Sequence, residues 1–310
     1  GLGNRGTMAL TSSTVSGNTS TVDGGGILSF TSTAILNVIN STVSGNTSNS
    51  TSFTTGGIDA SGTLTVTNST ISGNSITGLT GNSGGGIWFG GTTATITAST
   101  ITNNTAAGPN TGSGIYRNAG TVTVRDSIVA ANANNATVPD TFANDGTGFA
   151  SNGYNLIGNP GAVSVFTQAG DQKGTATLPL NPGLAGLANN GGPTQTHALL
   201  AGSPAIDAGD NCVVHNTCSP ALGLTLVTDQ RGTGFGRLAD GNSDTAATVD
   251  IGAFEVVGCT QAPANLLAWY SGEGDPKDRF GINDLNWSGT AAYGAGKVNQ
   301  AFSFSGAQFA

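Results

Sequence analysis

Short runs of alternating apolar and polar residues recur along the first half of the chain. Three of these runs are Ala34 to Ile39, Thr63 to Thr67 and Thr121 to Val124. A period of two places the apolar side chains on one face of a β-strand. Gly, Asn and Ser follow the runs and favour turns, so the pattern predicts many short strands separated by turns.

The predicted strands belong to a repeat of about 28 residues. The phrase STVSGNTS occurs at 13–20 and again, unchanged, at 41–48, and related phrases begin at Ser69, Ser99, Ser127 and Asn155. A second phrase, GGGI or a shortened form of it, keeps the same rhythm. A fixed period of this length is typical of solenoid proteins, in which each repeat stacks on the next.

Stacking places equivalent residues of successive repeats in columns about 4.8 Å apart. One predicted inward column comprises Val15, Val43, Ile71, Ile101, Val129 and Ile157, and a second comprises Ile27, Ile58, Ile87 and Ile115. A third set of equivalent residues is polar: Asn18, Asn46, Asn74, Asn104 and Asn132. We expect these asparagines to share a corner, to suit its left-handed backbone, and to hydrogen-bond as a ladder. The glycines before each isoleucine predict another corner, where side chains would collide.

The repeated STISGN and GGGI phrases resemble the coils of right-handed parallel β-helices of the pectate-lyase-like superfamily, in particular those of bacterial surface proteins. The resemblance covers about residues 1–166. It implies an all-β fold, a right-handed solenoid and a three-faced cross-section. The expected first domain is therefore a parallel β-helix over residues 1–169.

The 28-residue repeat ends near Gly170, and a different set of sequence phrases begins. The phrases LNPGL, NNGGPT, AGSPAIDAG, TDQRG and DIGAFE follow one another in order between Leu180 and Glu255. The set resembles the C-terminal segment of bacterial surface β-helix proteins of the choice-of-anchor type. Because the last coil of a solenoid exposes unpaired strand edges and an open core, we expect residues 170–258 to form its end and cap.

Residues 259–310 resemble the opening strands of a laminin-G-like, concanavalin-type sandwich. A complete sandwich of this type needs many more residues than this segment contains, so the segment predicts an incomplete β-sandwich. Truncation is one explanation. The alternative is that a neighbouring chain completes these strands in a head-to-tail assembly.

Composition narrows the classes of function. The chain has 310 residues, of which 50 are glycine and 8% are charged, and its net charge is −8 with nine Lys and Arg in total. So few cations argue against nucleic-acid binding. No run of 18 apolar residues occurs, so the sequence predicts no membrane span.

The cysteines suggest an oxidising compartment. Cys212 and Cys218 flank the short loop CVVHNTC, which predicts a small disulfide ring and leaves Cys259 over. A metal site that includes His215 is the alternative interpretation, although no second pair of ligands follows.

A calcium site is a second metal hypothesis. Asp240, Asn242 and Asp244 alternate like the start of a calcium loop, but the pattern lacks the remaining EF-hand ligands. Asp, Asn and Gly also form turns without any ion. The sequence thus predicts no cofactor, with calcium as the alternative.

Catalytic chemistry has little support in the repeats. The acidic residues of the coils are scattered, and the one concentration of charge there, Arg117 with Arg125 and Asp126, is interpreted as an exposed ion pair. His197 lies outside the coils and is expected to make a structural hydrogen bond. We predict a protein that is not an enzyme, with a polysaccharide lyase or hydrolase as an alternative.

Binding chemistry is suggested by two aromatic residues. Trp88 and Tyr116 each follow a corner isoleucine and are expected to point outward on adjacent coils. Their rings would form a platform for a glycan or another protein, unless the loop after Gly78 packs over them. The sequence therefore predicts an extracellular or cell-surface structural protein, such as a stalk, an adhesin module or a filament subunit, with a carbohydrate-binding adhesin as the first alternative.

Overall fold

The computed structural model describes residues 1–21, 23–50, 55–77, 83–106, 111–132, 138–242, 244–257, 292–295 and 300–303. The chain divides into two compact units, Gly1–Gly258 and Cys259–Ala310.

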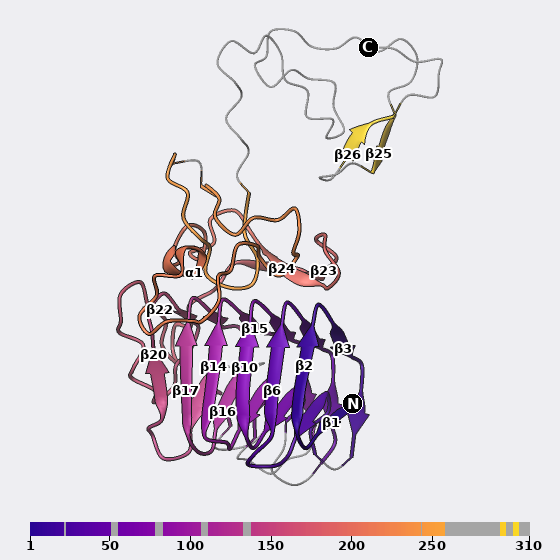
Figure 1. The fold of residues 1–310 in the computed structure, drawn as a ribbon, viewed down its shortest axis with the longest axis vertical. Helices are drawn as coiled ribbons and strands as arrows, with labels where there is room; N and C mark the ends of the chain where they lie inside the picture. The colour runs from indigo at the N-terminus through magenta and orange to yellow at the C-terminus, as the bar shows by residue number, and fades with distance from the viewer. Residues whose placement is uncertain are drawn as a thin grey trace. The chain divides into compact units, whose positions relative to one another are not determined.

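The first unit is built on a parallel β-solenoid of about five turns (Figure 1). Three long sheets form its faces, and each takes one strand from every coil. Sheet 1 contains β1 (Leu2–Asn4), β5 (Ile27–Ser29), β9 (Ile58–Ala60), β13 (Ile87–Phe89), β16 (Ile115–Arg117) and β19 (Thr141–Ala143). Sheet 2 contains β2 (Thr7–Thr11), β6 (Ile35–Ile39), β10 (Thr63–Thr67), β14 (Thr93–Thr97), β17 (Thr121–Arg125) and β20 (Phe149–Ser151).

Sheet 3 has the narrowest strands and the longest column. It contains β3 (Thr14–Ser16), β7 (Thr42–Ser44), β11 (Thr70–Ser72), β15 (Thr100–Thr102), β18 (Ile128–Val129), β21 (Leu156–Ile157) and β22 (Gln172–Lys173). A short fourth sheet contains β4 (Thr19–Ser20), β8 (Thr47–Ser48) and β12 (Ser75–Ile76).

The register of the sheets confirms the two predicted apolar columns. Val43 pairs with Val15 on one side and with Ile71 on the other, and the column continues through Ile101, Val129 and Ile157. Ile58 pairs in the same way with Ile27 and Ile87, and Ile87 pairs with Ile115. All ten side chains are buried, and they pack into one continuous core between the sheets. Each coil therefore covers the apolar face of the next.

The asparagines form the ladder that the repeat predicts. The side-chain amide of Asn46 donates to Asn74 Oδ1 at 2.8 Å, and the amide of Asn74 donates to Asn104 Oδ1 at 2.9 Å. The backbone N–H of each asparagine donates to the same oxygen of the following coil. Asn18 and Asn132 extend the ladder at its two ends.

The ladder has one direction and ends on a carboxylate. Every amide of the ladder donates a hydrogen bond toward the following coil, so the last position of the column needs an acceptor and no donor. Asp140 occupies that position: its Oδ1 accepts bonds from both the backbone and the side chain of Asn132, and its Oδ2 accepts the Asn159 N–H at 2.6 Å. Burial raises the pKa of Asp140, whereas these hydrogen bonds lower it.

A second ladder of serines runs parallel to the first. The backbone N–H of Ser41 donates to Ser69 Oγ, and the N–H of Ser69 donates to Ser99 Oγ. This column also ends on a carboxylate, because Asn155 in the last coil donates from its backbone and side chain to Asp171 Oδ1.

The left-handed corner residues differ from the expected ones. The residue before each ladder asparagine has positive φ: Gly17, Gly45 and Gly73 in the first three coils, and then Asn103 and Ala131. The ladder asparagines therefore recur at this position because of their hydrogen bonds and not because of a left-handed backbone. The glycine before each corner isoleucine has another cause: a Cβ on Gly57 would lie 2.3 Å from the carbonyl oxygen of Gly86.

The segment after the coils covers a side of the solenoid, which corrects the expectation of an end cap. Val163 and Phe166 close the core at the last coil, and β22 adds the final rung of sheet 3. Beyond β22 the chain turns back along the outer face of sheet 3 (Figure 1), and we call residues 174–257 the lateral cover. The cover contains the hairpin β23 (Leu184–Ala188) and β24 (Thr196–Leu199), and the short helix α1 (Cys212–His215).

Hydrogen bonds attach the cover to successive coils. Gln230 accepts a bond from Thr70 Oγ1 at 2.6 Å and donates to Thr42 Oγ1 at 2.8 Å. Arg237 donates to Asn68 Oδ1, and Thr100 Oγ1 accepts the Ala253 N–H.

Apolar packing attaches the cover to the later coils. The outward position that is threonine in β7, β11 and β15 becomes Ile128 in β18 and Leu156 in β21. Both side chains are buried against the cover in a second core with Ile251 and Phe254. The cover thus binds sheet 3 by hydroxyls at one end and by apolar contacts at the other.

The second unit is described over one antiparallel pair, β25 (Tyr293–Ala295) and β26 (Gln300–Phe302). The remaining strands expected for a laminin-G-like segment, and Cys259, lie outside the described residues.

We expect the Asn74→Ala variant to lower the free energy of unfolding by about 3 kcal/mol, because it removes four hydrogen bonds and strands buried donors of Asn46. Chemical denaturation measures the change. Asn37→Ala is the matched control, since Asn37 is half-buried on the outer face of β6 and should shift stability by less than about 0.5 kcal/mol. Equal effects of the two changes would show that the ladder contributes little.

Candidate functional site: a threonine-lined pocket beneath the disulfide loop

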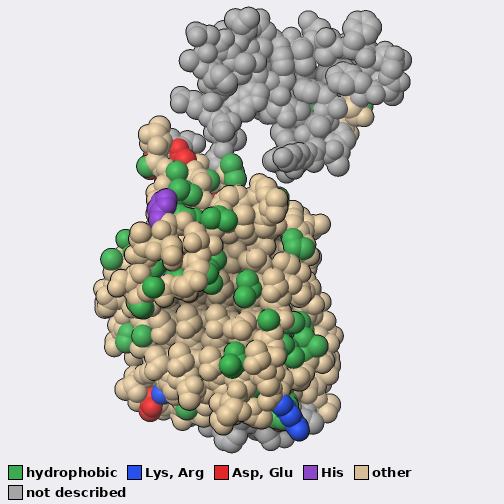
Figure 2. Space-filling view, in the orientation of Figure 1, with side chains coloured by type: hydrophobic (Ala, Val, Ile, Leu, Met, Phe, Trp, Pro, Cys, Tyr) green, Lys and Arg blue, Asp and Glu red, His purple; other side chains and the backbone are tan. Residues whose placement is uncertain are grey.

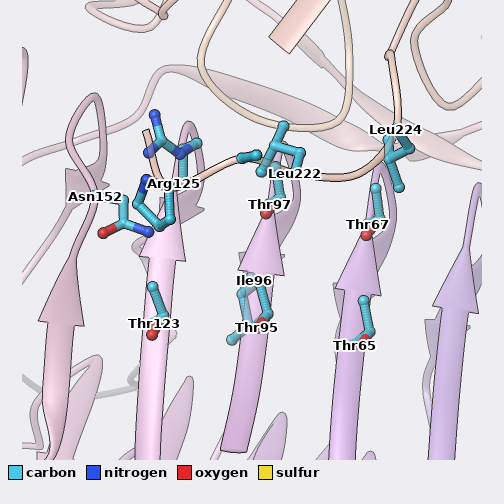
Figure 3. Close-up of a pocket in the computed structure, with 12 residues that line it drawn as sticks. Thr65, Thr67, Thr95, Ile96, Thr97, Thr123, Arg125, Asn152, Leu222 and Leu224 are labelled. Atoms are coloured by element: carbon cyan, nitrogen blue, oxygen red, sulfur yellow. The ribbon is translucent and has the colours of Figure 1, made fainter. Parts of the chain in front are cut away.

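A pocket of about 310 Å³ lies on the outer face of sheet 2, under the part of the cover that follows the disulfide. Its floor is formed by β10, β14 and β17, and its roof by Pro220, Ala221, Leu222 and Leu224. Figure 3 shows Leu222 reaching toward Thr97, and Leu224 toward Thr67, from the loop above. The volume is in the range of small-molecule sites.

The floor is a regular array of hydroxyls. Alternate residues of a strand face outward, so sheet register brings Thr65, Thr95 and Thr123 into one column and Thr67 and Thr97 into the next. Along β14 the exposure falls steadily: Thr93 is exposed, Thr95 is half-buried and Thr97 is buried. The pocket therefore opens toward the bare part of sheet 2 and closes under the loop.

Arg125 forms the polar side of the closed end. Its side chain is 4% exposed, and it donates to the carbonyl oxygen of Ser219 at 2.7 Å. Its guanidinium also lies 3.6 Å from Asp210 Oδ2. Arg125 Nε has no hydrogen-bond partner in the described part of the chain. Beside it, the half-buried Asn152 also lines the pocket (Figure 3).

The disulfide fixes the loop to which Arg125 binds. Cys212 and Cys218 are joined, as their spacing predicts, and Arg125 lies 3.4 Å from Cys212 Sγ. The bond excludes these sulfurs as thiolate ligands for a metal at His215. Ser219 follows the ring directly, so the ring positions the carbonyl oxygen that accepts the hydrogen bond from Arg125.

Arg117, Arg125 and Asp126 are each buried, which corrects the expectation of an exposed ion pair among them. Arg117 bonds Asp145 at 2.5 Å, whereas Arg125 and Asp126 make separate contacts. Asp126 Oδ1 accepts the backbone N–H of Asp210, and burial raises the pKa of Asp126 to about 7. Arg125 and Asp126 therefore join the coils to the cover, whereas Arg117 bonds within the coils.

The predicted aromatic platform is wrong for one of its two rings. Trp88 and Tyr116 are direct register partners, as expected, and Trp88 is half-buried. Tyr116 is fully buried, and its ring stacks on that of Phe142 with centroids 5.5 Å apart. In the same column, burial raises the pKa of Asp59 to about 7. A tyrosine with no exposed surface cannot stack on a ligand without prior movement.

Ser72 and His197 form a serine–histidine pair between coil and cover. Ser72 Oγ lies 2.7 Å from His197 Nε2, and His197 Nδ1 lies 2.6 Å from the carbonyl oxygen of Ala185. Because a carbonyl can only accept, Nδ1 carries the proton and Nε2 accepts from the serine. Both side chains are buried, and burial lowers the pKa of His197, so the neutral ring acts as a connector.

The cover contains a cluster of buried charges. Arg231 pairs with Asp229 at 2.6 Å and lies between the rings of Phe235 and Phe254. Burial and the neighbouring charge of Asp250 raise the pKa of Glu255 to about 9. Arg237 is fully buried nearby and donates to backbone carbonyls of the same segment.

The calcium hypothesis falls on a loop whose acceptors are partly occupied by its own backbone. Asp240 accepts the N–H groups of Asp244 and Thr245, and Asn242 Oδ1 accepts the Asp244 N–H at 2.8 Å. These bonds are of the turn type that also explains the residues from sequence. Within the described ranges, no group of three or more His, Cys, Asp and Glu side chains is arranged to hold a metal.

Comparison with models of protein families, with curated proteins and with solved structures finds no match for this chain. Among the described residues, no helix has the length and apolar character to cross a membrane.

Sequence reasoning missed the pocket and most of the contacts of the cover. The sequence places Arg125 only in a charge cluster, and its partner Ser219 is 94 residues away. One signal was present: the outward position of sheet 3 changes from Thr100 to Ile128 and Leu156, and an apolar residue there indicates a covered face.

We expect Glu255→Gln to change the pH dependence of stability. The pKa of Glu255 is raised in the folded state, so its contribution is present at low pH and is lost as the pH rises from its ordinary pKa toward about 9. Relative to the native protein, the variant should gain up to about 1.4 kcal/mol of unfolding free energy per pH unit over this range. Denaturant titrations at several pH values measure the difference. Parallel profiles would contradict the burial of a protonated Glu255.

Proposed function

We propose that this protein is a rigid, non-catalytic structural module of the cell exterior, serving as a surface stalk, an adhesin module or a subunit of a surface filament. We also propose that it is a relative of the right-handed pectate-lyase-like β-helices of bacterial surface proteins, with a choice-of-anchor-type cover and a laminin-G-like continuation.

The observation that carries this proposal is the continuity of the ladders. Three parallel sheets and two side-chain ladders connect the coils of residues 1–173. Bending such a rod at one coil requires the backbone and side-chain bonds of that coil to open together. The cover adds bonds to the coils containing Thr42, Thr70 and Thr100, so it braces the rod along its length.

The surface composition and the disulfide support the proposed extracellular localisation of the protein. Figure 2 shows a face with few charged side chains, in keeping with 8% charged residues overall. Threonine hydroxyls occupy the outward positions of β10 and β14 in sheet 2, which makes a surface that is well hydrated and offers few charged sites to proteases. The Cys212–Cys218 disulfide suits an oxidising compartment.

Two other classes of function remain as alternatives. A carbohydrate-binding adhesin is favoured by the hydroxyl-lined pocket. A polysaccharide lyase or hydrolase would need acidic and basic groups that reach a substrate, and the acids Asp126 and Asp140 in the coils are buried and bonded to backbone N–H groups.

Hydrogen exchange tests the rigidity. We expect the backbone amides of sheets 1, 2 and 3 to exchange slowly in every coil from β5 to β21, because they open only with global unfolding. Rapid exchange of a whole internal coil would contradict a rigid rod. Electron microscopy of the purified protein then separates single rods from head-to-tail filaments.

Incubation with neutral and uronate polysaccharides, with and without calcium, tests the absence of catalysis. We expect no new reducing ends and no unsaturated uronate products. Sustained product release, abolished by Arg125→Ala, would replace the structural proposal with an enzymatic one.

A further inference from the structure

We propose that the pocket between sheet 2 and the disulfide loop binds a neutral saccharide unit. This inference is independent of the structural role: a rod can carry a binding site, and the site would remain if the rod proved to have another purpose.

The threonine hydroxyls of the pocket floor are available for hydrogen bonds to a ligand. The side chains of Thr65, Thr67, Thr95, Thr97 and Thr123 line the pocket, and their hydroxyls make no hydrogen bond within the described part of the chain. This contrasts with sheet 3, where Thr42 and Thr70 bond Gln230 and the space above them is filled. The same residue type is thus satisfied under the cover and left available in the pocket.

Each threonine hydroxyl both donates and accepts, as do the hydroxyls of a sugar. The floor repeats at about 4.8 Å between strands and about 6.6 Å between alternate residues of one parallel strand. A ligand that satisfies several of these groups together needs many hydroxyls around a compact ring. The volume of about 310 Å³ admits a ligand of that size.

The roof is apolar and faces the array. Leu222 is half-buried and Leu224 is 37% exposed, and both project toward the threonines (Figure 3). A sugar ring has an apolar face of C–H groups besides its hydroxyls, so it matches a site with a polar floor and an apolar roof. A purely polar ion would make no use of the apolar surface that these leucines present to the pocket.

Charge at the closed end favours a neutral ligand over an anionic one. Arg125 lies 3.6 Å from Asp210, so the net charge offered to a ligand is small. Arg125 and Asn152 still supply planar donor groups at that end, and Arg125 Nε is a donor with no described partner. We therefore expect a monosaccharide, or the terminal unit of a chain, with its ring over the threonines and its polar edge toward Arg125 and Asn152.

The test uses the full chain and saturation-transfer NMR with glucose, galactose, mannose, xylose, N-acetylglucosamine and cellobiose, with galacturonic acid as the anionic comparison. The Thr95→Val and Thr123→Val variants keep the shape of the side chain and remove the hydroxyl. We expect at least one neutral saccharide to bind, and each variant to weaken its binding about tenfold.

Thr93→Val is the matched control, because Thr93 lies on the same strand as Thr95 but is exposed outside the pocket. Its affinity should stay within about twofold of the native value. Circular dichroism shows whether each variant is folded. If one of the two pocket variants does not fold, the other still tests the proposal. Reduction of the Cys212–Cys218 disulfide should also weaken binding, because it releases the roof.

Three results would overturn the proposal. The first is no saturation transfer to any neutral saccharide in the panel. The second is binding that Thr95→Val and Thr123→Val leave unchanged, which would place the ligand elsewhere. The third is tighter binding of galacturonic acid than of every neutral sugar, which would show that the arginine acts as an uncompensated charge. Cleavage of a bound saccharide would contradict the proposed non-catalytic function, whereas the proposal that the pocket binds a saccharide would still hold.

Discussion

The hydrogen bond from one ladder asparagine to the next is the contact on which the solenoid depends. Apolar burial has no direction, so the apolar columns fix which residues of a strand face inward but do not specify individual donor–acceptor partners. The bond from Asn46 to Asn74 has a donor, an acceptor and a length of 2.8 Å, so it is made in one register only. A shift of one residue would leave two buried donors of Asn46 without an acceptor. The ladder therefore selects the register, and the valines and isoleucines of the core provide most of the stabilisation.

Both ladders also solve a problem that any directional column has at its end. Each internal oxygen accepts from the preceding coil while the same residue donates to the next, but the last residue has nothing to which it can donate. Asp140 and Asp171 stand at these two ends, and each accepts several N–H groups without needing to donate. The repeat thus stops where an amide gives way to a carboxylate. Val163 and Phe166 then close the apolar core at the same coil.

Outward threonines of the solenoid have two different environments, one under the lateral cover and one in the pocket. On sheet 3, Thr70 bonds Gln230 and is buried under the cover. On sheet 2, the cover extends only as a loop that is held by the Cys212–Cys218 disulfide and by Arg125, so Thr95 and Thr123 stay unbonded and reachable. A structural use and a binding use can therefore occupy neighbouring faces of one rod. The rigidity that suits a surface module also holds the hydroxyl array in a fixed geometry, which lowers the entropic cost of binding.

The sequence by itself determined the coils, the two apolar columns, the asparagine ladder and the disulfide, because each depends on identical residues at a fixed spacing or on two cysteines close in the chain. Val43 over Ile71 and Asn46 over Asn74 follow from the period alone. It did not determine the path of residues 174–257, the burial of Tyr116 or the pocket. These depend on contacts between residues far apart in the chain, such as Arg125 with Ser219 and Thr70 with Gln230. Such contacts do not follow the repeat, so its spacing does not predict them. Only the tertiary structure decided that the cover lies along the side of the rod, because burial of Ile128 and Leu156 needed an apolar partner that no neighbouring coil supplies.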